Sequence, residues 1–169
     1  MSAAIGGTST VEYRSAVVYL VFDNVIPIGI VVVVTGAKVF LFGAGPKERT
    51  WCEGVSAQMP YVVSMVGRYK LDVELAMMSR LDVMLTMDSA NMHLASLVGL
   101  RCLSIWGATH RYAGFLGYGQ QEADCIERPL SCRPCSIYGN KPCHMGDYPC
   151  LKEITPQVVA ERILNALHD

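Results

Sequence analysis

Short apolar runs alternate along this chain with segments in which apolar residues return every three or four positions. The runs are typical of buried strands, and the recurring positions are typical of helices with one apolar face. From residue 38 onward, the runs predict strands at 39–42, 61–65, 82–87, 102–106 and 123–126. Helices are predicted to start at 46, to cover 71–78, to lead from 89 to 98, and to start again at 155.

The predicted helices carry boundary signals of their own. Pro46 suits a first helical position, and Gly99 stands where a left-handed residue ends many helices. Thr155-Pro156 is a capping residue followed by proline. The apolar face of the last helix consists of Val158, Val159, Ile163, Leu164 and Leu167. Strands separated by single helices indicate right-handed βαβ units, so we expect an α/β fold with a parallel sheet.

The segment Val17–Val34 is strongly apolar but contains Asp23, Asn24 and Pro27. Its stretch without polar side chains, Val25–Val34, is shorter than the ~20 residues that cross a membrane. Valine and isoleucine dominate the segment, which predicts one or two strands. A single weak membrane anchor is the alternative. A signal peptide is not expected, because no basic region precedes the apolar residues.

Composition narrows the function classes. The chain has 169 residues, of which 51% are hydrophobic, enough for the core of one domain. Its net charge is −1 and lysine and arginine do not cluster, which argues against a nucleic-acid partner. An odd number of cysteines, seven, without an export signal favours a reducing compartment, and we expect a cytoplasmic protein.

The segment Asp88–His93 carries the most specific chemistry. It joins a predicted buried strand to a predicted helix, and a helix start offers free N–H groups and the positive end of the helix dipole. In a parallel sheet it shares one edge with the loops 43–48 and 107–111, where ligands bind. Asp88, Ser89 and His93 are therefore candidates to hold a phosphorylated ligand. The alternative, equally weighted from this segment alone, is that Ser89 caps the helix and His93 packs against the sheet.

Two enzyme classes are disfavoured. A serine hydrolase would need a G-x-S-x-G turn, and Ser89 and His93 belong to a single helical turn. A dinucleotide-binding enzyme would need a third glycine where Glu48 stands after Gly43 and Gly45. Glu48 could bind sugar hydroxyls, including those of ribose, or could be solvated.

Four cysteines, Cys132, Cys135, Cys143 and Cys150, lie close together near the end of the chain. One C-x-x-C knuckle with two further thiols can complete a tetrahedral zinc site, and four thiolates would make that zinc structural. His144 is a spare ligand. Free thiols or a disulfide pair are the alternatives.

Five motifs occur together in a specific order. They are Val39–Gly45, Asp88-Ser89 with His93-Leu94-Ala95, Trp106-Gly107-Ala108-Thr109, Cys132-Arg133-Pro134-Cys135 and Ile154-Thr155-Pro156-Gln157-Val158-Val159. In this order and spacing, the chain from Gly36 to its end resembles the carboxyl-terminal half of glycosyltransferase family 9, the ADP-heptose:lipopolysaccharide heptosyltransferases.

The resemblance implies a Rossmann-like parallel sheet with helices on both faces, one half of a two-domain glycosyltransferase B-type fold. It implies an inverting enzyme that requires no cofactor, whose carboxyl-terminal domain binds the nucleotide sugar. By that resemblance Asp88 contacts the sugar, the N–H groups of Ser89 and Ala90 hold the diphosphate, and His93 supports them. Gly107 and Thr109 border the donor pocket, and Glu48 lies near the ribose.

Two features depart from the family. Ala90 and Ala108 stand where the family usually has glycine and proline. Residues 1–35 form an atypical apolar leader, truncated or altered relative to the family's acceptor domain, before a nucleotide-sugar-binding domain at 36–169 with a cysteine-rich loop at 132–150. The catalytic base is expected in that acceptor domain, so the catalytic residues are unknown.

These observations predict a heptosyltransferase-like domain that binds an ADP-sugar for transfer to the lipopolysaccharide core. It would work in the cytoplasm, at the inner face of the inner membrane, with peripheral membrane association. The alternatives are an inactive nucleotide-sugar-binding fragment and a zinc-stabilised structural module.

Overall fold

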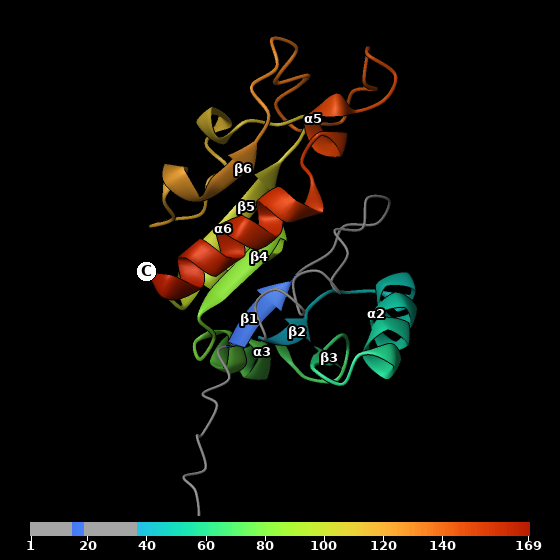
Figure 1. The fold of residues 1–169 in the computed structure, drawn as a ribbon, viewed down its shortest axis with the longest axis vertical. Coiled ribbons are helices and arrows are strands. Elements are labelled where there is room, and N and C mark those ends of the chain that lie inside the picture. The colour runs from blue at the N-terminus through green and yellow to red at the C-terminus, as the bar shows by residue number, and fades with distance from the viewer. Residues whose placement is uncertain (1–14, 19–36) are drawn as a thin grey trace, which may run out of the picture.

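A computed structural model describes residues 15–18 and 37–169 of the chain (Figure 1). Six strands form one sheet in the order β3-β2-β1-β4-β5-β6, and every neighbouring pair is parallel. The strands are β1 Ser15–Val18, β2 Lys38–Leu41, β3 Val62–Ser64, β4 Val83–Met87, β5 Cys102–Trp106 and β6 Cys125–Glu127. The expected α/β fold with a parallel sheet is confirmed.

The central strand comes from the amino-terminal segment. β1 lies between β2 and β4, and Val17 stands opposite Phe40 on one side and Met84 on the other. The sheet therefore begins before residue 36, where the predicted domain boundary was placed. The apolar segment Val17–Val34 overlaps β1 at its first two residues, and 19–34 lies outside the described residues.

Helices cover both faces of the sheet, as the resemblance implies. They are α2 Pro46–Gln58, α3 Leu71–Met78, α4 Ala90–Leu97, α5 Pro149–Lys152 and α6 Pro156–His168. Residues of α2 and α6 pack into one apolar cluster, and residues of α3 and α4 pack into another. Figure 1 shows α6 lying along β4, with α2 beside β2 and β3.

The two clusters follow from the alternation of side chains along each strand. In β4, Val83 and Leu85 join the α2–α6 cluster, whereas Met84 joins the α3–α4 cluster. All five residues of β5 are buried, as expected of a strand covered on both faces. Burial on both faces explains why these strands appear in the sequence as continuous apolar runs.

Most predicted boundaries hold within one or two residues. β5 has the predicted bounds, and Gly99 follows the end of α4 with φ +69°, as a residue that terminates a helix does. The last predicted strand, 123–126, is displaced: Glu122–Asp124 form a 3₁₀ turn, and the strand is Cys125–Glu127.

The last helix begins as predicted, since the Thr155 hydroxyl accepts a hydrogen bond from the Val158 N–H at 3.4 Å. Its predicted apolar face needs one correction. Val159, Ala160, Ile163 and Leu167 are buried, but Val158 is 45% exposed because it lies on the side of α6 away from the sheet.

No helix within residues 15–18 and 37–169 is long and apolar enough to cross a membrane. Apart from its first two residues, which belong to β1, the segment of the weak-anchor alternative lies outside this part of the chain.

Candidate functional site

The predicted ligand edge coincides with the point where the strand order reverses. The sheet runs from β1 outward in both directions, and β4 is the first strand on the second side. In doubly wound sheets, ligands bind in the crevice at this point, outside the carboxyl ends of the strands. Asp88 directly follows β4, and Gly107 directly follows the neighbouring β5.

The structure brings two predicted site residues into contact. The Thr109 hydroxyl donates a hydrogen bond to Oδ2 of Asp88. Thr109 is buried and Asp88 is half-buried. The loops after β4 and β5 therefore converge, as their positions in a parallel sheet predict.

The surroundings of Asp88 act on its charge in opposite directions. Burial raises the pKa of the Asp88 carboxyl above its ordinary value, whereas the Thr109 hydrogen bond, a backbone hydrogen bond and the Arg133 charge lower it. The net direction is upward, because desolvation penalises the ionised form more than these partners favour it.

The beginning of α4 corrects one expectation about Ser89. Its N–H donates to the carbonyl of Met87 at 2.8 Å, so it is engaged in the turn rather than free. Ser89 is the N-cap residue of α4, as the alternative expects, but its hydroxyl lies 3.0 Å from that of Thr86 and makes no capping hydrogen bond. Ala90 is exposed at the first position of the helix, where a main-chain N–H has no intrahelical acceptor.

His93 lies on the exposed side of α4, while Met92 and Ala95 face the core. The alternative in which His93 packs against the sheet is therefore wrong. Since Ala90 and His93 are three positions apart in a helix, they share the exposed side.

Glu48 closes the loop before α2. The N–H of Ala44 donates to Oε2 of Glu48 at 2.6 Å. A carboxylate in the first turn of a helix that reaches back to an N–H before it stabilises the helix start, as in a capping box. Glu48 is half-buried and carries this hydrogen bond, so it is not simply a solvated residue.

Gly107 is required for packing. A Cβ at this position would lie 2.8 Å from the side chain of Leu151 in α5. Leu151 therefore fills the space that a side chain would take, and the Gly107 carbonyl accepts a hydrogen bond from Arg133.

Sequence reasoning missed Arg133 as a site residue, although its motif carried part of the resemblance. Its side chain is 3% exposed and binds the main-chain carbonyls of Gly107 at 2.6 Å and Thr109 at 3.1 Å. It also forms an ion pair with Glu127 at the end of β6, at 3.2 Å. A buried arginine with several carbonyl partners leaves no periodic signal in a sequence.

Glu127 is shared by several basic groups. Arg111 also forms an ion pair with it, and the His110 Nε2 lies 4.0 Å from it. Burial lowers the pKa of His110, and the nearby charges of Arg133 and Arg111 lower it further. A neutral His110 is consistent with its Nδ1 accepting the Tyr112 N–H at 3.2 Å.

The four predicted zinc ligands are free thiols. Among the described residues, no group of three or more histidine, cysteine, aspartate or glutamate side chains is arranged to hold a metal ion. Burial raises the pKa of Cys150, the Arg133 charge opposes this, and the other three thiols of the loop add to the rise. The described thiols do not form a ligand set, and the zinc site stays a prediction.

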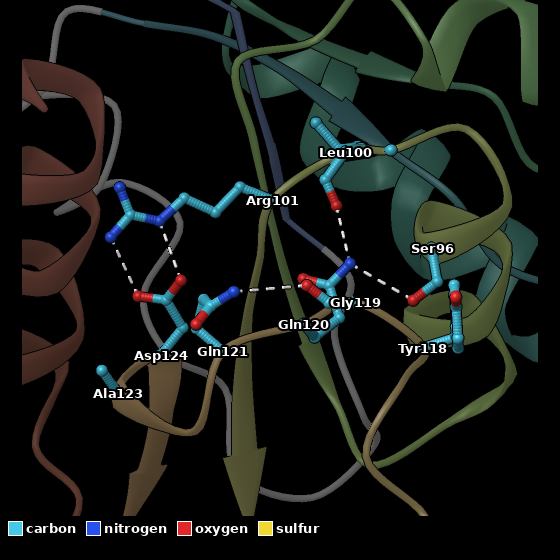
Figure 2. A pocket seen from close by; sticks show the side chains of 10 residues that line it. Ser96, Leu100, Arg101, Tyr118, Gly119, Gln120, Gln121, Ala123 and Asp124 are labelled. Atoms are coloured by element: carbon cyan, nitrogen blue, oxygen red, sulfur yellow. Dashed lines mark hydrogen bonds and ion pairs between the residues drawn. The ribbon is translucent and has the colours of Figure 1, made fainter.

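A cavity of about 500 Å³ lies at the opposite edge of the sheet, before β5 and β6. Figure 2 shows hydrogen bonds and ion pairs that join Arg101, Gln120 and Gln121 to neighbouring side chains and to the main chain. Gln120 donates to the Ser96 hydroxyl and to the Leu100 carbonyl, and Arg101 donates hydrogen bonds to both carboxylate oxygens of Asp124. Its position at the amino ends of the strands separates it from the predicted donor edge.

With this geometry in place, comparison with known proteins decides the family. The sequence profile described as glycosyltransferase family 9 (heptosyltransferase) matches residues 30–145, more than half of the chain. The chain belongs to glycosyltransferase family 9. The resemblance inferred from the five motifs is confirmed.

Two Campylobacter jejuni proteins named lipooligosaccharide heptosyltransferase 2 are 24% identical to the chain, over 130 and 133 residues. These matches cover 75% and 76% of the chain and 40% of each relative. The chain therefore spans about 40% of the length of the curated relatives that it matches.

Solved structures support the fold. The E. coli ADP-heptose lps heptosyltransferase II is similar with a TM-score of 0.68 at 17% identity, over 95% of this chain and 48% of that one. The dodecameric iron-containing heptosyltransferase TibC, in complex with ADP-D-beta-D-heptose, is similar with a TM-score of 0.61 at 13% identity. The match covers 95% of this chain and 47% of that one. The half-length match agrees with one Rossmann-like half of a glycosyltransferase B-type fold.

The family membership favours a heptosyltransferase-like domain over the two alternatives, the inactive fragment and the zinc-stabilised module. It does not test individual residues. Asp88, Ser89, Ala90, His93, Gly107, Thr109 and Glu48 stay predictions as donor-binding residues.

Proposed function

We propose that the described residues form the donor-binding half of a heptosyltransferase, which holds an ADP-sugar for transfer to the lipopolysaccharide core. The observation that carries this proposal is the contact between Asp88 and Thr109 at the reversal point of a family 9 sheet. It is supported by the relatives, one named as an ADP-heptose enzyme and one solved with ADP-D-beta-D-heptose.

The diphosphate of the donor is proposed to lie at the start of α4. Ala90 offers a first-turn N–H there, and the helix dipole favours negative charge. Because the Ser89 N–H already donates to Met87, Ala90 and the helix dipole carry most of this interaction. As the diphosphate leaves, its negative charge grows, and fixed donors stabilise that charge without rearrangement.

The Asp88 carboxylate is proposed to accept hydrogen bonds from hydroxyls of the transferred sugar. Thr109 donates to one carboxylate oxygen, which fixes the carboxyl group in place. Glu48 is proposed to lie near the ribose and His93 to support the diphosphate from the exposed side of α4. The catalytic base is proposed to belong to the acceptor-binding half, since transfer needs a base on the side opposite the departing nucleotide.

Calorimetric titration of the purified chain with ADP-heptose and with ADP tests the assignment. Asp88→Asn is expected to weaken ADP-heptose about 10- to 100-fold, the effect of losing hydrogen bonds to a charged group, and to weaken ADP much less. Asp72→Asn is the matched control, because Asp72 is an exposed carboxylate in the first turn of α3, and it is expected to leave both affinities unchanged.

Two results would contradict the proposal. One is that the parent chain binds neither ligand. The other is that Asp88→Asn weakens ADP and ADP-heptose equally, which would mean that Asp88 does not contact the sugar.

Transfer to a lipid A–Kdo acceptor tests the complete activity. Turnover with ADP-heptose would confirm a transferase and exclude a domain that binds the donor without using it. We place this reaction at the cytoplasmic face of the inner membrane, with peripheral association, because the acceptor is a lipid.

A structural metal at the four cysteines stays a separate proposal, because the thiols are not assembled into a ligand set in the described structure. Four thiolates suit zinc and also iron, and TibC is described as iron-containing. Metal analysis of the purified chain for zinc and iron is decisive. About one ion per chain supports the site, and finding neither metal at that level contradicts it.

A further inference from the structure

Three consecutive carbonyls of the loop after β5 receive their hydrogen bonds from one short segment. Gly107 accepts from Nε of Arg133 at 2.6 Å, Ala108 accepts from the N–H of Cys135 at 2.9 Å, and Thr109 accepts from Nη2 of Arg133 at 3.1 Å. The loop lies more than 20 residues from Arg133 in the sequence. The carbonyls of the loop are therefore hydrogen-bonded by residues distant in the sequence rather than by residues next to the loop in the chain.

Arg133 is suited to this task by its geometry and its burial. Its guanidinium group is planar and presents five N–H donors in a fixed fork, which a lysine ammonium does not. Nη1 donates to the Arg128 carbonyl at 2.7 Å, and the ion pair with Glu127 balances the charge. A side chain that is 3% exposed and bonded to four groups has little freedom to move.

We propose that Arg133 and Cys135 form a clamp, which holds loop 107–109 in place and so presents the Thr109 hydroxyl to Asp88. Arg133 is a positioning residue here: it contacts the loop, and the loop contacts the carboxylate. The proposal rests on the proposed function for its effect on donor binding, but the clamp itself exists without a donor.

The clamp gives the cysteine-rich loop a role in the donor site. Cys135 supplies one of the three hydrogen bonds, and Arg133 lies between Cys132 and Cys135 in the knuckle. Whatever fixes the shape of this knuckle also fixes the loop after β5.

Amide hydrogen exchange in the chain without ligand tests the clamp directly. The Cys135 N–H is expected to exchange at least about tenfold faster in Arg133→Gln than in the parent, because opening the segment frees this amide. Arg133→Lys keeps the charge and is expected to restore little of the protection. Arg101→Gln is the matched control: it breaks an arginine–carboxylate pair at the opposite edge of the sheet and should leave the Cys135 amide protected.

A double-mutant cycle with ADP-heptose then tests whether the clamp acts through Thr109. Arg133→Lys and Thr109→Val are each expected to weaken ADP-heptose by about tenfold, and the double variant by little more than either alone. Losses that multiply in the double variant would mean that Arg133 does not act through Thr109. Thr109→Val is used because it keeps the volume of the side chain, and Arg133→Lys is used because it keeps the positive charge.

The outcomes separate the clamp from the proposed function. If the parent chain binds no ADP-heptose, the proposed function fails, and hydrogen exchange still decides the clamp. If Arg133→Lys leaves both the Cys135 exchange rate and ADP-heptose binding unchanged, the clamp is wrong while the donor site stands. If Arg133→Gln does not fold, Arg133→Lys decides both questions.

Discussion

Asp88 is the residue on which the proposed donor site depends. It follows a buried strand, is half-buried itself, and is bonded to Thr109 from the neighbouring loop. The sequence predicted Asp88 from its position, because it directly follows an apolar run at the carboxyl end of a strand. Thr109 was predicted through the family resemblance. The sequence could not predict Arg133, since its acceptors are main-chain carbonyls that no side-chain pattern records.

The charge of Asp88 predicts how ADP-heptose affinity depends on pH. In the proposed site the ionised carboxylate would accept the sugar hydroxyls, and burial raises the pKa of Asp88 above its ordinary value of 3.8. Affinity is therefore expected to be full at neutral pH and to fall as the pH is lowered through this raised pKa. Calorimetry from pH 7 to about pH 4.5 measures the fall, over a range where an unperturbed aspartate stays mostly ionised.

Asp88→Asn is the control for this prediction. Its weaker affinity should change little over the same range, because asparagine does not titrate. An equal fall in the variant would assign the pH dependence to another group, such as His110 or the donor itself.

At the scale of elements, α5 packs directly against the loop after β5. Leu151 occupies the space above Gly107, where a Cβ would lie 2.8 Å away. The sequence suggested that Gly107 borders the donor pocket. The structure gives a packing reason for glycine at this position, which depends on an element too short to predict from its four residues.

Gly107→Ala is expected to destabilise the chain by about 1–3 kcal/mol, the usual cost of overpacking. Combining it with Leu151→Ala should recover part of the loss caused by the added methyl group. Gly54→Ala is the matched control: nothing lies within 4 Å of the added Cβ in α2, and the change should stabilise by about 0.5–1 kcal/mol. Thermal unfolding measures all four chains, and a Gly107→Ala variant as stable as the parent would contradict the packing argument.

The cysteines differ in predicted reactivity according to the elements that carry them. Burial acts to raise the pKa of Cys143, but backbone N–H groups of residues 145–148 lower it below its ordinary value. Burial raises the pKa of Cys52 in α2 to about 11 and that of Cys102 in β5 to about 12. Since the thiolate is the reactive form, the loop thiol should react first.

Alkylation at neutral pH, followed by mass spectrometry, is expected to modify Cys143 well before Cys52 and Cys102. Adding a chelator during alkylation gives the internal control, because a bound metal would protect the loop thiols until it is removed. Modification of Cys102 at the rate of Cys143 would contradict the described burial.

At the scale of the whole molecule, the strand order is the part of the fold that the sequence left open. The alternation of strands and helices predicted a parallel sheet, yet it left the order of the strands open. The order β3-β2-β1-β4-β5-β6 depends on a central strand from the amino-terminal segment, which the sequence reasoning had placed outside the domain. That segment has the composition of a strand, but no local signal says where in a sheet a strand will pair.

The strand order favours one of the two edges of the sheet for the proposed donor site. The reversal point between β1 and β4 places the crevice beside Asp88. The cavity of Figure 2 lies at the other edge, where Gln120 is bonded to Ser96 and Arg101 to Asp124. Family membership and strand order therefore point to the same edge for the nucleotide sugar.

A crystal structure of the chain with ADP-heptose tests this conclusion most directly. We predict the diphosphate at the start of α4, within hydrogen-bonding distance of the Ala90 N–H, and a sugar hydroxyl on Asp88. ADP-heptose bound instead among Arg101, Gln120 and Asp124, or at any site away from the carboxyl ends of β4 and β5, would contradict it.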